Sequence, residues 1–172
     1  MNKYLLTFVL LSGIVSESFA QDNENTYKAF LYDNSVQVEL FGHGLFYSVN
    51  YEKILFNGNK FKTAGQIGVS YYPPQSGVLT VWVPFLVDEI LSFGKYHLEI
   101  GGGHVFTLER YPDVVPGIWT YSWTGFFIAR AGIRYQKPEG HFIVRLAFTP
   151  FFEYVDAFDF HPSGGLALGY AF

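Results

Sequence analysis

Six charged side chains of opposite sign stand at alternate positions of apolar segments, where they could pair with each other or act as general acids and bases. The acids are Glu39, Glu52 and Glu99, the bases are Arg130, Arg134 and Arg145, and Asn50, Gln66 and His97 share their face. Unpaired charges in a confined interior would be costly, so we expect hydrogen-bonded ion pairs that form a polar plug. The alternative, a catalytic carboxylate pair, requires an open cleft. We predict no catalytic residue and no enzyme.

A second chemical pattern is His161-Pro162-Ser163, in which a histidine and a serine stand two positions apart. It resembles the His-x-Ser pair of outer-membrane lipid A deacylases, where the serine is a nucleophile, the histidine activates it and an acid orients the histidine. The resemblance implies an acid further along the chain, but no Asp or Glu follows Asp159. We therefore expect a Pro-Ser turn that enters the final strand. A lipid-modifying enzyme is kept as an alternative function.

Other chemistry has weaker support in the sequence. The five histidines (His43, His97, His104, His141 and His161) show no HExxH or paired spacing, so no metal site and no cofactor are predicted. The glycines at 101–103 open no helix, which argues against a phosphate loop; we expect them to bend a strand or relieve crowding. A net charge of −4 without a basic cluster argues against nucleic acid as a partner.

These residues belong to segments whose apolar residues alternate with a period of two, which predicts β-strands. Helical spacing fits none of them well. The expected strands are residues 35–41, 45–55, 61–72, 78–87, 96–108, 123–136, 141–153 and 164–172. Compact turns at 56–60, 91–95 and 137–140 alternate with connections at 42–44, 73–77, 110–122 and 154–163, of which the last two are long. Short turns at one end and long loops at the other are typical of outer-membrane barrels.

Side-chain size indicates which face is inside. In the last strand Leu166, Leu168, Tyr170 and Phe172 alternate with Gly165, Ala167, Gly169 and Ala171. An eight-stranded barrel has little internal room, so we expect small residues inside and bulky ones facing lipid. Charged residues are 15% of the chain and aromatic ones 20%. Aromatic residues also gather near strand ends, where rings would sit at headgroup level: Tyr47, Tyr51, Tyr71, Tyr72, Tyr96, Trp123, Tyr135, Phe142 and Phe172. A soluble barrel with an aromatic core is the alternative.

The two ends of the sequence carry targeting patterns. Residues 1–20 have Lys3, an apolar run and a small-residue end, which predicts a signal peptide cleaved before Gln21. Residues 21–34 follow as a short lead, and residues 35–172 as an all-β, eight-stranded antiparallel up-and-down transmembrane barrel. The chain has no cysteine, which excludes disulfides and a lipoprotein anchor. The ending GGLALGYAF resembles the sorting motif of bacterial outer-membrane barrels, read by the barrel-assembly machinery.

The mature chain as a whole resembles the small outer-membrane β-barrel proteins common in Bacteroidota. The likeness is carried by GHGLFYSVNYEKIL, YHLEIGGG, RAGIRYQKPEGHFIVRLAFTPFF and GGLALGYAF. It implies the fold and a place in the cell outer membrane, and gives no catalytic residues. We expect a monomer in outer-membrane lipid with a structural or surface-interaction role, acting through its long loops on an unknown extracellular ligand. A small-solute channel is a further alternative, which the polar plug disfavours.

Overall fold

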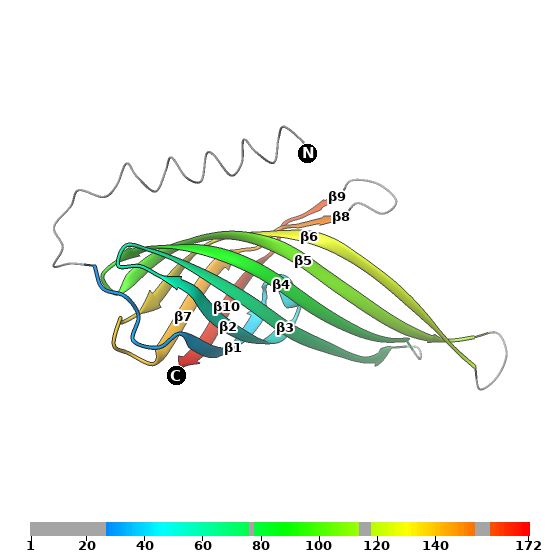
Figure 1. The fold of residues 1–172 in the computed structure, drawn as a ribbon. Coiled ribbons are helices and arrows are strands. Elements are labelled where there is room, and N and C mark those ends of the chain that lie inside the picture. The colour runs from blue at the N-terminus through cyan, green and yellow to red at the C-terminus, as the bar shows by residue number, and fades with distance from the viewer. Residues whose placement is uncertain (1–26, 76–77, 114–117, 154–158) are drawn as a thin grey trace, which may run out of the picture.

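The computed structural model describes residues 27–75, 78–113, 118–153 and 159–172, and almost all of them lie in strands (Figure 1). The predicted signal peptide and its cleavage point lie outside these residues. The strands are β1 (Asn34–Phe41), β2 (Tyr47–Asn57), β3 (Phe61–Gln75), β4 (Val78–Phe93), β5 (Tyr96–Pro112), β6 (Trp119–Gln136), β7 (Phe142–Phe148), β8 (Phe151–Glu153), β9 (Asp159–His161) and β10 (Gly164–Ala171). A short 3₁₀ helix, η1 (Gly42–Gly44), joins β1 to β2.

The strands form one closed antiparallel sheet. Each strand from β1 to β6 pairs with the next, and β6 continues through β7 and β10 back to β1, where Ser35 lies opposite Ala171. Two wall strands are interrupted: β7 and β8 are separated by Thr149 and Pro150, and β9 and β10 by Pro162 and Ser163. The predicted eight-stranded antiparallel barrel is therefore confirmed. Among the described residues no helix is long and apolar enough to cross a membrane.

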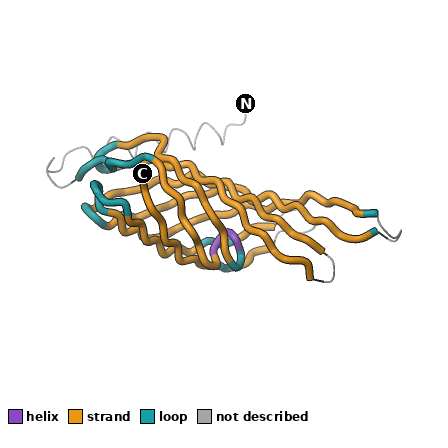
Figure 2. Tube along the Cα trace, turned by 90° about the horizontal axis from the view of Figure 1, so that it is seen from below, coloured by secondary structure: helices purple, strands orange, loops and turns teal. Residues whose placement is uncertain are grey.

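The two ends of the barrel differ in how far the strands extend beyond its wall. One end, called the turn end below, carries the short connections β2–β3, β4–β5 and β6–β7, of which the second is the pair Gly94 and Lys95 with Gly94 at φ +69°. At the other end, called the ribbon end, β5 and β6 run far beyond the strands on the opposite side of the barrel (Figure 2).

The predicted loop at 110–122 is wrong at both margins. Arg110 pairs with Tyr121, and Pro112 with Trp119, so most of that segment continues the β5–β6 hairpin. Its aromatic and β-branched residues favour extended backbone. The turn predicted at 91–95 is likewise shorter, because β4 extends to Phe93.

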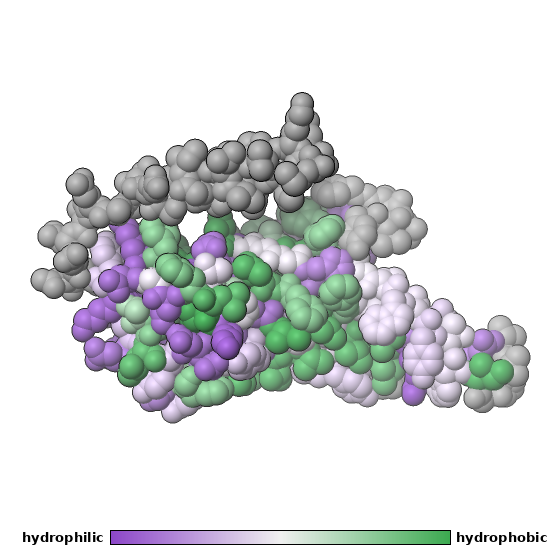
Figure 3. Space-filling model, in the orientation of Figure 1, coloured by the Kyte–Doolittle hydropathy of each residue, from purple (hydrophilic) through white to green (hydrophobic). Residues whose placement is uncertain are grey.

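The alternation of faces is confirmed along the wall. On β10, Leu166, Leu168 and Tyr170 are exposed, whereas Ala167 and Ala171 are buried. Figure 3 shows apolar residues over the middle of the barrel and hydrophilic ones gathered at the turn end. Such an apolar band around a closed barrel is what a lipid-facing wall requires.

The expectation that bulky residues all point outward is wrong at the ribbon end. Phe126 and Phe151 are buried inside the barrel with their ring centroids 5.0 Å apart, and Trp82 packs edge-on against both. Tyr72, predicted for the aromatic belt, also points inward: its hydroxyl donates to the Gly44 carbonyl. Toward the ribbon end no arginine of the described residues fills the interior, and these large rings take up the space beside small polar residues such as Ser70 and Thr107.

Candidate functional site

The predicted inward charges all lie inside the barrel, and they come from different parts of its wall. Glu39 is on β1, Glu52 on β2, Glu99 on β5, Arg130 and Arg134 on β6, and Arg145 on β7. All six are buried, as are the predicted neighbours Asn50, Gln66 and His97. The shared inward face is therefore confirmed, and the acids and bases meet across the lumen.

Two glutamates and two arginines form a closed ring of ion pairs. Arg134 donates to Glu52 at 2.8 Å and to Glu99 at 3.0 Å. Arg145 lies 2.5 Å from an oxygen of each of the same two carboxylates. Each carboxylate thus meets two guanidinium groups, and each guanidinium meets two carboxylates. Such multiple charge-assisted contacts are what offset the cost of removing ions from water.

Arg130 forms the centre of a second group nearer the ribbon end. Its Nη1 atom donates to Asp88 Oδ2 at 2.7 Å and to Gln66 Oε1 at 2.6 Å. Its Nη2 atom donates to Nδ1 of His43 at 2.8 Å and lies 3.6 Å from Glu39 Oε2. Gln66 Oε1 also accepts from Arg145 at 3.3 Å, so the two groups form one continuous network.

Three titratable side chains of the interior were missed by sequence reasoning. Asp88 lies one residue beyond the predicted strand 78–87; its alternation with Leu86 and Ile90 was the available signal. His43 was treated as a scattered histidine, yet it is fully buried in η1. Lys62 is buried too, and its Nζ donates to Ser92 Oγ at 2.7 Å.

The arrangement is suited to holding the barrel together. Every carboxylate of the network has a guanidinium within ion-pair distance, and none lies in an open cleft of the described residues. A general acid or base needs access to a substrate atom. Within the described ranges no three His, Asp or Glu side chains are placed to hold a metal ion.

The second predicted pattern is only partly assembled. His161 Nε2 lies 3.4 Å from Asp159 and 3.8 Å from Glu153, so acids precede the histidine in sequence rather than follow it. No acid follows Asp159 in the sequence, but antiparallel pairing of β8 with β9 brings Glu153 opposite Asp159, so two preceding acids lie near His161. Ser163 instead directs its hydroxyl to the carbonyl of Gly42, 3.5 Å away.

The glycines at 101–103 relieve crowding, as predicted. A Cβ at Gly101 would meet the Asp88 carboxylate, and one at Gly103 would meet the backbone of Phe85. The Asp88 carboxylate therefore fits beside this strand only because Gly101 has no side chain.

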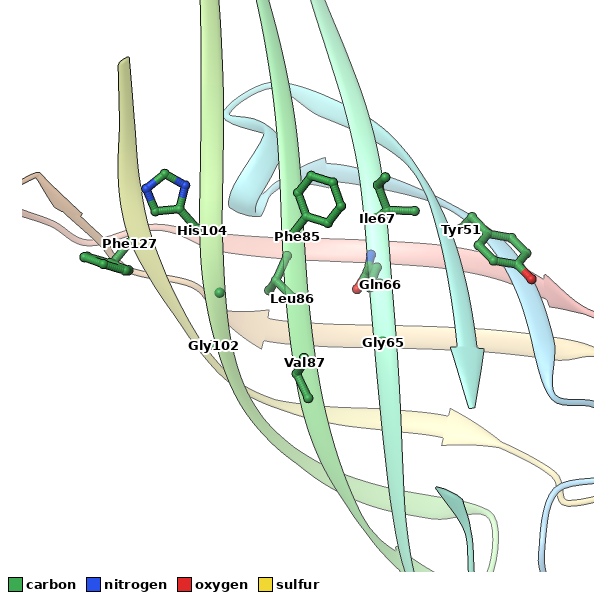
Figure 4. Close-up of a pocket in the computed structure, with 11 residues that line it drawn as sticks. Tyr51, Gly65, Gln66, Ile67, Phe85, Leu86, Val87, Gly102, His104 and Phe127 are labelled. Carbon is green, nitrogen blue, oxygen red and sulfur yellow. The ribbon is translucent and has the colours of Figure 1, made fainter. Parts of the chain in front are cut away.

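A groove of about 730 Å³ lies on the outside of the wall, not in the lumen. Tyr51, Ile67, Phe85 and His104 stand along it on neighbouring strands, with Phe127 on β6 (Figure 4). It forms where Gly65 and Gly102 replace bulky outward side chains. The groove is a dent in the apolar wall and holds no cluster of catalytic groups.

Comparison with known proteins gives a likeness in structure alone. The N-terminal β-barrel domain of Pseudomonas aeruginosa OprF superposes with a TM-score of 0.56 at 9% identity, covering 84% of this chain and 100% of the domain. Ail, the attachment invasion locus protein of Yersinia pestis, gives 0.51 at 10% identity, covering 86% of this chain and 99% of Ail. The chain has the fold of the small eight-stranded outer-membrane barrels.

The complex of Ail with the heparin analogue sucrose octasulfate gives a TM-score of 0.53 at 11% identity, covering 81% of this chain and 94% of that one. No protein-family model matches the sequence, and no curated protein matches it. The likeness therefore extends to the fold of the small barrel proteins and not to their activities.

Proposed function

We propose that this chain is a monomeric barrel of the cell outer membrane whose lumen is closed and whose ribbon end binds a partner outside the cell. The observation that carries the proposal is the extension of β5 and β6 beyond the rest of the barrel. A purely structural barrel needs strands only long enough to cross the bilayer, about 9–11 residues each. β6 runs from Trp119 to Gln136 and exceeds that length.

The projecting part of β6 carries aromatic side chains that are exposed at the surface and available to a partner. Trp119, Tyr121 and Trp123 face the same side of the strand and are all exposed, Trp123 by 68%. Arg110 of β5 lies over the Trp119 ring at 4.3 Å and holds it in place. Exposed aromatic and arginine side chains are the residues that most often anchor protein interfaces.

The same segment also has a free strand edge. Between Trp119 and Phe126, β6 pairs with β5 alone as far as the structure describes the chain. Pairing on its other side begins at Phe127 and Ile128, which lie opposite Phe152 and Phe151 of β8. An unpaired edge offers backbone donors and acceptors to an added strand. An extended polypeptide segment is therefore the partner that fits this surface.

A polyanion fits it less well. Ail has been crystallised with a heparin analogue, but in this chain Arg110 stands beside Glu109 and near Asp113. The acids offset the single cation of this part of the ribbon, and a polyanion requires clustered bases.

Labelling of single cysteines on intact cells tests the location and orientation. The chain has no cysteine, so Ser122→Cys on the ribbon and Asn59→Cys in the β2–β3 turn are each unique. A maleimide that cannot cross membranes is expected to label Ser122→Cys on intact cells, and Asn59→Cys only after the outer membrane is permeabilised. The opposite pattern, or labelling of neither, would refute the proposed placement.

Photo-crosslinking tests the partner. A photoreactive amino acid at Thr124, which is exposed on the free part of β6, is expected to give a discrete crosslinked protein band on intact cells. The matched control is Leu98, exposed on the lipid-facing wall, and it is expected to give none. Equal crosslinking from the two positions, or none from Thr124 in any growth condition, would contradict a ribbon-end partner.

A lipid-modifying enzyme remains the second candidate, because His161 has acidic neighbours at 3.4 and 3.8 Å. Lipid and the barrel-assembly machinery are the further partners that we propose for insertion. The channel alternative depends on the lumen, and its test is given in the Discussion.

A further inference from the structure

The residues before β1 cross the mouth of the barrel at its turn end. Residues 27–33 form no strand. Only 4% of the surface of Phe30 is exposed, whereas its neighbour Leu31 is 63% exposed. The Phe30 side chain therefore enters the lumen while the backbone around it stays outside. The Phe30 ring therefore fills the lumen at the turn end. The cluster around Phe126 fills the lumen at the ribbon end.

The site that receives Phe30 is built for an aromatic ring. Ile54, Ala64 and Ile90 form its apolar floor. Lys62 Nζ lies 4.6 Å from the ring centroid, and the guanidinium of Arg134 lies 5.4 Å from it. His97 meets the ring edge-on at 5.0 Å. Two cations near one ring favour an aromatic side chain over an aliphatic one of similar size.

One side chain clamps the backbone on either side of the ring. Asn57 accepts from the Phe30 N–H at 2.9 Å and donates to the Phe30 carbonyl at 2.8 Å. The same amide donates to Asp33 at 2.7 Å. On the far side of the mouth, the Leu31 N–H donates to the Pro138 carbonyl at 2.8 Å.

The lead forms no strand of its own, and besides the bonds of Phe30 and Leu31 its Asp33 carbonyl accepts from the Ile54 N–H of β2 at 2.7 Å. Closure is made by β1 and β10, which pair from Ser35 and Ala171 to Phe41 and Gly165. Removal of residues 27–33 from the mouth would therefore break the clamp without opening the β1–β10 ladder. Segments with few backbone ties open at lower free energy than the sheet that they cover.

We propose that the turn-end mouth is a binding site for an aromatic side chain carried on an extended peptide segment, and that residues 27–33 occupy it in cis as a displaceable clasp. This inference does not rest on the proposed partner at the ribbon end, which lies at the opposite end of the barrel. When the clasp leaves, Lys62, Arg134 and His97 line an open vestibule above the ion-pair ring.

A single cysteine under the ring tests the clasp in the full chain. Ala64 is fully buried on the floor of the site, and the chain has no other cysteine. The labelling rate of Ala64→Cys by a small water-soluble thiol reagent is measured alone and with changes at Phe30. We expect Phe30→Ala to raise the rate by about tenfold or more. Phe30→Leu, which keeps apolar volume but loses the cation–π contacts, should raise it by roughly threefold.

Two controls separate opening of the mouth from general loosening. Leu31→Ala, at the exposed neighbour, should leave the Ala64→Cys rate unchanged. Ala167→Cys, buried on β10 beside Glu39 and Arg145, should stay unlabelled in the Phe30→Ala chain, and the heat-dependent gel shift of a folded barrel should persist.

Three outcomes would overturn the proposal. An unchanged rate at Ala64→Cys with Phe30→Ala would show that the ring does not close the mouth. Equal labelling of Ala167→Cys would show that Phe30 acts as core for the whole barrel. A Phe30→Leu chain as closed as the original would show that the site does not recognise an aromatic ring.

Discussion

Glu52 on β2 and Arg134 on β6 lie 2.8 Å apart across the lumen, although 82 residues separate them in sequence. The two strands are not neighbours in the sheet. The bond therefore joins opposite sides of the barrel wall, and it resists any motion that would flatten or open the barrel. Glu52 also forms an ion pair with Arg145, so this carboxylate joins β2 to β7 as well as to β6.

Removal of one arginine from the ring should destabilise the folded barrel. Arg145→Met keeps much of the side-chain volume but leaves Glu52 and Glu99 with one cation fewer. Breaking a buried pair in this way costs about 3–5 kcal/mol, and less where water reaches the site. We expect the temperature at which the folded form disappears on gels to fall clearly. The measurement is the gel shift after stepwise heating.

The matched control is Lys137→Ala, an exposed residue of the β6–β7 turn. It should leave that temperature unchanged. An Arg145→Met barrel as heat-resistant as the control would show that the ring contributes nothing to stability.

The sequence was sufficient to predict the shared inward face, because a strand period of two assigns every second residue to the same side. It was not sufficient to identify which acid meets which base. That depends on register and on pairing across the lumen, as for Asp88, which contacts Arg130 from a strand two steps away in the sheet. Phe30 could not be predicted, since Tyr27, Phe30, Leu31 and Tyr32 follow no strand or helix period that would single out one inward side chain.

Charge placed on the outer wall should be costly in a way that depends on position. Leu168 is exposed near the middle of β10, between Val38 and Val144 on the neighbouring strands. If this face meets lipid, Leu168→Arg should lower the free energy of unfolding in vesicles by about 2–4 kcal/mol. Tyr121→Arg, on the projecting ribbon, should change it little. Denaturant titration followed by tryptophan fluorescence gives both values, and equal costs would argue against a lipid-facing band.

The lipid-modifying alternative makes a prediction of its own. A nucleophile and its base lose most of their activity when either is removed. Since the Ser163 hydroxyl points to Gly42, we expect lipid A to be unchanged by His161→Ala, by Ser163→Ala or by deletion of the gene. Mass spectrometry of lipid A is the measurement. An acyl chain lost only when both residues are intact would establish the enzyme.

The lumen should conduct no steady ion current. Along its length it contains the Phe30 ring, the ion-pair network and the cluster of Phe126, Phe151 and Leu86 in turn. An eight-stranded barrel has room for little more than such side chains. Purified protein in planar bilayers should therefore be silent. Phe30→Ala alone should remain silent as well, because the network and the apolar cluster still fill the path. A stable, ion-selective current in the unaltered chain, with selectivity changed by Arg145→Met, would replace the closed barrel by a channel.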